Sequence, residues 1–138
     1  MDLDAVLKQG QEAMAAGRWQ ESAQHFGLAA QRKPSHWVAW HNLGLSLLAL
    51  GKAQQALSAC QRAYGLNPAL WQSRLVQGKA QKLLGNMVGA DGCFADVLKA
   101  DPSNGQALVA RADLAMNTFG DPLQAVAWVK PLLGHPEH

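Results

Sequence analysis

A spacing of 34 residues recurs in three independent sets of residues along this chain of 138 residues. Pro34, Pro68 and Pro102 form the first set. Two glycine series keep the same spacing: Gly10, Gly44 and Gly78, and then Gly17, Gly51 and Gly85. A fixed period of about 20 to 50 residues is typical of stacked repeat proteins, in which each unit buries its apolar face against its neighbours. Such an array leaves a long curved surface free, so the period predicts a binding architecture, and any chemistry must be shown separately.

Each period is expected to contain two helices, with a glycine between them and a proline after the second. The glycine suits a left-handed backbone that is strained for residues with a Cβ. The proline lacks an amide donor and disfavours helical geometry in the residue before it, so the second helix ends there. The series that begins at Gly10 falls inside the first helices and predicts a close crossing of the two helices of each unit. The expected helices are 4–15, 19–31, 37–50, 53–66, 71–84, 88–100, 106–117 and 122–133.

Composition limits the classes of partner. Charged residues make up 16% of the chain, below the ~25% usual for soluble domains, which predicts a large core or a surface that a partner covers. The formal net charge of +2 and the lack of a basic run argue against nucleic acid. No stretch approaches the ~18 apolar residues that cross a bilayer, and the N-terminus does not resemble a secretory signal, so no membrane partner is expected.

Cysteine and histidine usage predicts neither a metal site nor catalysis. Cys60 and Cys93 have no metal or redox spacing and are expected to be reduced core residues, which predicts a cytoplasmic protein. The histidines do not pair with cysteines or carboxylates at metal-ligand spacing: His25, His36, His41, His135 and His138. No phosphate-binding loop or nucleophile elbow is present in the sequence. We expect no cofactor, no metal and no enzymatic activity.

The second period resembles the tetratricopeptide repeat most clearly. Its signature residues are Trp40, Leu43, Gly44 and Leu47 in the first helix, Gly51 in the turn, Ala56, Cys60 and Ala63 in the second helix, and then Pro68. The resemblance implies an all-α fold, a right-handed α-α superhelix of about four helix-turn-helix repeats. It covers one domain over 1–138, with repeats at approximately 3–36, 37–70, 71–104 and 105–138, the last of them degenerate. Trp19 and Trp40 are expected in the core. The core is also favoured for Trp37 and Trp71, with exposure at an edge as the alternative.

The third unit departs from the family pattern. Arg74, Gln77 and Gln81 stand where the family usually has large apolar residues, and their spacing places them on one helix face. Two interpretations stay open: a degenerate repeat whose side-chain stems pack while the polar tips reach solvent, or a polar patch for a specific partner. Arg111 poses the same question in the fourth unit.

In proteins of this family the first helices line a concave groove, and helical spacing then gives the groove residues here. The candidate binding residues are Gln11, Met14, His41, Leu45, Leu48, Gln72, Leu75, Lys79, Lys82, Val109 and Asp113, with Leu7, Val38, Gln106 and Met116 on the same stripes. The expected partner is a protein or peptide segment with apolar and acidic residues, the acid meeting Lys79 and Lys82.

One subclass of the family binds chaperone C-terminal carboxylates through Lys, Asn and Arg residues of the first helices. The corresponding positions here are Leu7, Gln11, Asn42, Gln72 and Val76, of which only Asn42 agrees. We therefore do not expect a chaperone-tail adaptor.

The favoured function is a protein-interaction module that captures a peptide or helix without turnover. Two alternatives stay open: the N-terminal substrate-presenting module of a larger enzyme of glycosyltransferase, sulfotransferase or hydroxylase type, and a secretion-type chaperone. Repeat arrays usually end in a polar capping helix. The final expected helix carries Trp128 instead, which predicts a following domain, a partner, or self-association through this end.

Overall fold

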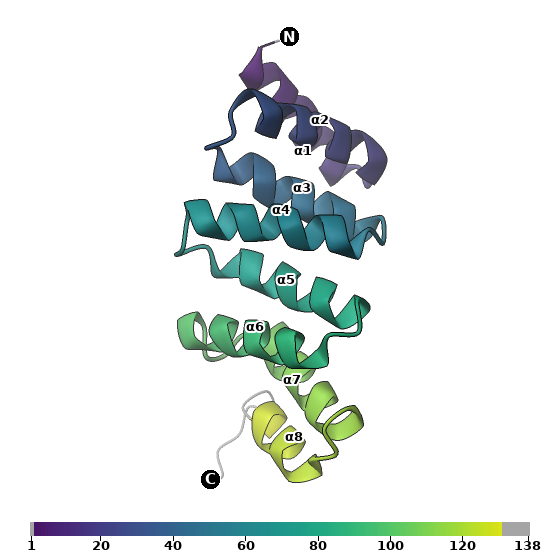
Figure 1. Ribbon diagram of the computed structural model, residues 1–138, viewed down its shortest axis with the longest axis vertical. Helices are drawn as coiled ribbons and strands as arrows, with labels where there is room; N and C mark the ends of the chain where they lie inside the picture. The colour runs from purple at the N-terminus through teal and green to yellow at the C-terminus, as the bar shows by residue number, and fades with distance from the viewer. Residues whose placement is uncertain (1, 131–138) are drawn as a thin grey trace.

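The computed structural model describes residues 2–130, in which every regular element is an α-helix. The helices follow one another along the long axis of the molecule, from the N-terminal end to α8 (Figure 1). They are α1 (Leu3–Ala15), α2 (Trp19–Arg32), α3 (Trp37–Ala49), α4 (Ala53–Leu66), α5 (Trp71–Leu83), α6 (Met87–Ala100), α7 (Gly105–Asn117) and α8 (Pro122–Val129). The expectation of an all-α fold of about four helix-turn-helix repeats is confirmed.

Helix boundaries follow the turn chemistry of the sequence. Described helix ends lie within one residue of the expected ones, except in the last helix. That helix was expected to reach residue 133, and 131–133 lie outside the described residues. Gly17, Gly51 and Gly85 have φ values of 76°, 78° and 83°, so each takes the left-handed conformation that was predicted for it. Gly120 takes the same conformation after α7.

In the first three units, a glycine of the first helix meets a side chain of the second helix. A Cβ on Gly10 would lie 3.0 Å from Cζ of Phe26, and one on Gly44 would overlap Sγ of Cys60. These contacts recur one period later at Gly78 and Phe94. The predicted close crossing of the two helices within each of these three units is confirmed.

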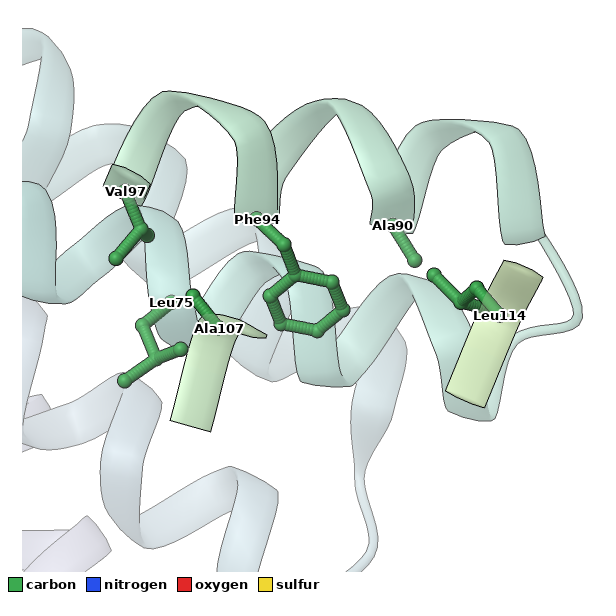
Figure 2. Close-up of a cluster of buried hydrophobic side chains, with 6 residues drawn as sticks. All are labelled: Leu75, Ala90, Phe94, Val97, Ala107 and Leu114. Atoms are coloured by element: carbon green, nitrogen blue, oxygen red, sulfur yellow. The ribbon is translucent and has the colours of Figure 1, made fainter. Parts of the chain in front are cut away.

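The core lies between the layers of first and second helices. In Figure 2, Ala90, Phe94 and Val97 extend from α6 toward Leu75, Ala107 and Leu114. These six side chains form one buried cluster over α5, α6 and α7. Burying a leucine or phenylalanine side chain contributes about 1.5–3 kcal/mol. Such contacts therefore hold one repeat against the next.

Leu75 corrects the predicted groove. It was expected to line the concave face, but it is only 8% exposed and packs in this cluster. The stripe on α5 was drawn as if that helix had a free face, whereas α7 and α6 both pack against it at Leu75. Leu75 is therefore a core residue and offers little surface to a ligand.

The tryptophans are less enclosed than expected. Trp40 and Trp71 pack against the core clusters, as expected. Nevertheless, Trp19, Trp37, Trp40 and Trp71 are half-buried rather than fully buried. Trp40 shows the physical reason, because its indole N–H donates a 2.8 Å hydrogen bond to the carbonyl oxygen of Pro34 at the edge of the array. The N–H of a partly buried indole needs a hydrogen-bond partner. Because that partner lies in the exposed turn between α2 and α3, the ring stays near the surface.

Candidate functional site

The helices α3, α5 and α7 are joined side by side through polar contacts. The Lys79 ammonium donates a 2.7 Å hydrogen bond to Oε1 of Gln106, which links α5 to α7. One turn further along, Lys82 Nζ lies 2.7 Å from Oδ2 of Asp113. On the other side of α5, His41 Nδ1 of α3 is 2.7 Å from the hydroxyl oxygen of Ser73. The helices α3, α5 and α7 therefore form one continuous face.

Two hollows on this face share the same pair of lysines. The first has a volume of about 560 Å³ and lies between Lys79, Lys82 and the apolar side chains of Leu48, Leu83 and Met87. The second, of about 630 Å³, runs from the same lysines onto α7 and is lined by Gly105, Gln106, Val109, Ala110 and Asp113. Apolar walls thus flank two ammonium groups on both sides.

A third hollow continues this surface to the C-terminal pair of helices. Its volume is about 330 Å³, and it shares Val109 and Asp113 with the second hollow. The other lining residues are Ala112, Met116, Asn117, Ala125, Val126 and Val129. On α8, Leu123 and Val126 are 83% and 58% exposed. Self-association was predicted for this end of the array, and it stays a prediction. Residues 131–138 lie outside the described part of the chain.

The lysines keep hydrogen-bonding capacity for a ligand. An ammonium has three donors, and Lys79 uses one on a neutral amide oxygen. Lys82 is paired with Asp113, but both side chains are about two-fifths exposed, at 42% and 41%. The hydrogen bond from Lys82, followed by that from Asn117, lowers the pKa of the Asp113 carboxyl from its ordinary value. Exposed ion pairs contribute only about 0–1 kcal/mol, so a carboxylate of a partner can compete for Lys82.

The structure brings together only part of the predicted groove. Leu48, Lys79, Lys82, Val109 and Asp113 line the hollows, as do Gln106 and Met116. The other predicted members line none of these three hollows: Gln11, Met14, His41, Leu45 and Gln72. Burial lowers the pKa of His41, which favours the neutral ring beside Ser73. The candidate site is therefore centred on α5 and α7.

Sequence reasoning missed several apolar contributors to these hollows, among them Leu83, Met87, Val126 and Val129. Met87 and Val126 belong to second helices, and a search restricted to first helices could not find them. Leu83 is 65% exposed. Its signal was visible in the sequence as two adjacent leucines at the end of α5, and Leu84 is also exposed, at 43%.

The polar stripe of the third unit is engaged within the protein. Arg74 of α5 donates from Nε to Oδ2 of Asp96 on α6 at 3.0 Å, and its guanidinium lies 5.5 Å from the ring centroid of Tyr64 on α4. Gln77 is 2% exposed; it accepts from Arg74 at 2.8 Å and donates to the carbonyl oxygen of Cys60 at 3.3 Å. The solvent-reaching interpretation is wrong for Gln77, and Arg74 is not free for a partner.

Arg111 of α7 is also engaged within the protein. Its Nε donates a 2.9 Å hydrogen bond to Oδ1 of Asp91 on α6. Its guanidinium also lies 4.0 Å from the ring centroid of Trp128 on α8. Like Arg74, this arginine bridges the two second helices that flank its own helix.

Residues 2–130 contain neither a metal-ligand cluster nor a membrane-spanning helix. In that range no group of three or more His, Cys, Asp or Glu side chains is arranged to hold a metal ion. None of the helices described there is both long and apolar enough to traverse a bilayer. His135 and His138 lie outside this range.

Residues 7–70 match the family model described as tetratricopeptide repeat, and the helix pairs continue the same pattern along the described chain. The chain is a tetratricopeptide repeat protein. Its helices form an array of the helical-repeat type.

The curated relatives are much longer than this repeat protein. DnaJ homolog subfamily C member 3 of Homo sapiens is 26% identical over 146 residues, an alignment that covers 96% of this chain and 29% of the human protein. The chain therefore spans less than a third of that relative. The rest of the human protein lies outside the alignment, so its activity does not carry over to this chain.

Solved structures share the fold at low identity. The crystal structure of MamA superposes with a TM-score of 0.90 at 19% identity, covering 96% of this chain and 77% of that chain. The first repeat domain of Spaghetti (RPAP3), bound to the HSP90 peptide SRMEEVD, gives a TM-score of 0.79 at 20% identity and covers 83% and 90%. At these identities the likeness shows the fold alone.

The five positions that correspond to chaperone-tail binding do not form a cationic set in this repeat protein. Val76 is buried, Leu7 packs against the core, and Asn42 is half-buried. Gln11 and Gln72 are exposed and uncharged. The expectation that this chain is not a chaperone-tail adaptor stays a prediction.

Proposed function

We propose that the face of α3, α5 and α7 binds an extended or helical segment of a partner protein, without turnover. Apolar side chains of the segment enter the hollows beside Lys79 and Lys82, and an acidic side chain or C-terminus pairs with one of the two ammonium groups. The observation that carries this proposal is the sharing of both lysines by two apolar-walled hollows.

Two physical terms have separate roles in this site. Contact with Leu83, Met87 and Val109 supplies affinity through burial of apolar surface, at about 25 cal/mol per Å². The lysines supply orientation and faster association rather than most of the affinity. Binding is therefore expected to weaken with salt, because exposed charges are screened over about 10 Å at 0.1 M ionic strength.

The test begins with panning of a phage-displayed library of random dodecapeptides against the folded chain. Recovered peptides are synthesised, and their affinity is measured by fluorescence anisotropy. The Lys79→Glu/Lys82→Glu double variant is expected to bind them at least about tenfold more weakly, which is about 1.4 kcal/mol. Lys52→Glu, a single replacement of the same type on an exposed lysine of the turn before α4, serves as the control for non-specific loss of positive charge. Equal affinity in the wild-type chain and both variants would exclude the hollows beside Lys79 and Lys82 as the binding site.

The peptide SRMEEVD is included as a separate ligand, because a related fold binds it. The absence of a cationic set at the five corresponding positions predicts that it binds no better than an acidic peptide of scrambled sequence. Preference for SRMEEVD over its scramble would identify a chaperone-tail adaptor instead.

A further inference from the structure

The outer side of the array carries three successive grooves, each with a first helix as its floor and two second helices as its walls. The floors are α3, α5 and α7, and each floor helix packs against the second helix before it and the one after it. An arginine lies against an aromatic ring in each groove: Arg62 on Trp40, Arg74 on Tyr64, and Arg111 on Trp128. The grooves can therefore be compared within one molecule.

The grooves over α5 and α7 are closed by ion pairs. Arg74 reaches from the floor to Asp96, and Arg111 reaches from the floor to Asp91. These side chains are between 21% and 35% exposed. Each arginine thus spans its groove and has its charge balanced by a carboxylate on a wall.

The groove over α3 has the opposite arrangement at the corresponding positions. Trp40 takes the floor position that Arg74 occupies 34 residues later, and Arg62 takes the wall position of Asp96. The Arg62 guanidinium lies 5.3 Å from the Trp40 ring centroid. Within residues 2–130, no carboxylate lies at ion-pair distance from Arg62. This groove therefore has an arginine on its wall without the carboxylate that the next two grooves supply.

The groove over α3 is also open, and its floor is apolar. Its volume is about 660 Å³, its floor is formed by Trp40, Leu43 and Leu47, and no acidic side chain lines it. The wall that lines this hollow is α4, with Gln54, Gln55, Ser58, Ala59, Gln61 and Arg62. Toward α2 the floor is uncrowded, because a Cβ on Gly27 would meet only Cδ1 of Leu43, at 3.9 Å. The floor residues are spaced as one face of a helix, so a helical or extended segment can run along them.

We propose that this outer groove, defined by Trp40, Leu43, Leu47 and Arg62, is a second docking site, separate from the face of α3, α5 and α7. Its occupant is a segment of a partner protein in which an aspartate or glutamate follows or precedes apolar side chains. The carboxylate of the partner pairs with Arg62 and balances its charge, as Asp96 balances the charge of Arg74 in the next groove. The apolar side chains cover the Trp40 ring and Leu43. Arginine is suited to this role, because its planar fork binds a carboxylate through two hydrogen bonds while stacked on an aromatic face.

The experiment uses the full chain with Lys79→Glu/Lys82→Glu, so that the face of the proposed function is disabled and the two sites are distinguished. The random dodecapeptide phage library is panned against this protein, and recovered peptides are measured by fluorescence anisotropy. The proposal expects peptides with an acid next to apolar residues. Gly27→Leu, which adds a side chain beside Leu43 of the groove floor without removing a contact, should abolish their binding, and Lys8→Glu on α1 should leave it unchanged.

A double-mutant cycle tests the pairing of charges. Arg62→Gln in the chain and acid→amide in the peptide should each weaken binding about fivefold, and the two changes together should weaken it no further than either alone. Peptides that bind equally well to the Gly27→Leu and Arg62→Gln proteins overturn the proposal, as does failure to recover any peptide. Sedimentation velocity addresses the remaining occupant: concentration-dependent association that Arg62→Gln removes would assign the groove to a second copy and overturn the partner segment.

Discussion

Phe94 of α6 occupies the space that a side chain on residue 78 of α5 would need. A Cβ at this glycine would lie 2.6 Å from Cε1 of the ring, closer than real Cβ contacts allow. The ring is 1% exposed and is enclosed by its cluster, so it cannot swing into solvent. The distance between α5 and α6 therefore depends on the absence of a side chain at Gly78.

Gly78→Ala is expected to destabilise the protein by about 1–3 kcal/mol, because an added methyl group in a packed core forces the helices apart. Urea unfolding monitored by circular dichroism measures the loss. Gly92→Ala is the matched control, since a Cβ there meets nothing within 4 Å. In an exposed helical position it should stabilise by about 0.5–1 kcal/mol. If both variants unfold at the wild-type urea concentration, the close crossing is not a determinant of the fold.

Asp113→Asn is expected to strengthen binding of acidic peptides to the face of α3, α5 and α7. A partner carboxylate must displace Asp113 from Lys82, and the amide removes that competing charge while keeping the shape of the side chain. An increase in affinity of about three- to tenfold is expected in fluorescence anisotropy, equivalent to about 0.7–1.4 kcal/mol. Lys82→Gln should have the opposite effect. Weaker binding by Asp113→Asn would mean that the aspartate itself contacts the ligand.

His41 is expected to make the fold less stable in mild acid. Burial lowers its pKa in the folded state below the ordinary value of 6.5, so the unfolded chain binds more protons when the pH falls below 6.5. The free energy of unfolding should therefore decrease as the pH drops from about 7 toward the folded pKa and level off beneath it. His41→Asn, which can keep a hydrogen bond to Ser73, should flatten this part of the profile. An unchanged profile in the variant would assign the acid sensitivity to another group.

The two cysteines are expected to be unreactive in the native protein. Burial raises the pKa of the Cys60 thiol to about 12, with the Ser73 hydrogen bond acting in the opposite direction, and burial also raises that of Cys93. Since the thiolate is the nucleophile, a chromogenic disulfide reagent at pH 8 should label them only as fast as the chain unfolds. Both should react at once in guanidinium chloride. Rapid labelling of the native chain would show that α4 or α6 opens locally.

The period of 34 residues was sufficient to predict the helices and their pairing, because the responsible residues act locally. Gly51 requires a left-handed turn and Pro68 ends a helix whatever lies around them. The close crossing at Gly44 and Cys60 was also predictable, since a helix keeps a glycine in its interior where another helix approaches. Both cysteines are free and buried, as expected.

The site was predicted less well, because it depends on how three helices meet. Leu75 has the spacing of a groove residue, yet it is covered by α6 and α7. Met87 comes from a second helix, whereas the groove was predicted from first helices alone. Gln77 has the composition of a surface residue, but it satisfies the carbonyl of Cys60 and the guanidinium of Arg74 in the interior. Helical periodicity gives the face of a single helix, whereas these three outcomes depend on its neighbours.

Mapping a recovered peptide by nuclear magnetic resonance tests the central claim most directly. Titration of the peptide into the isotopically labelled chain should shift amide signals of α5 and α7, with the largest changes around Lys79, Lys82 and Val109. The first helix, around Gln11 and Met14, should be unaffected. Shifts confined to α1 and α2, or shifts that persist unchanged in the Lys79→Glu/Lys82→Glu protein, would contradict a binding groove centred on these two lysines.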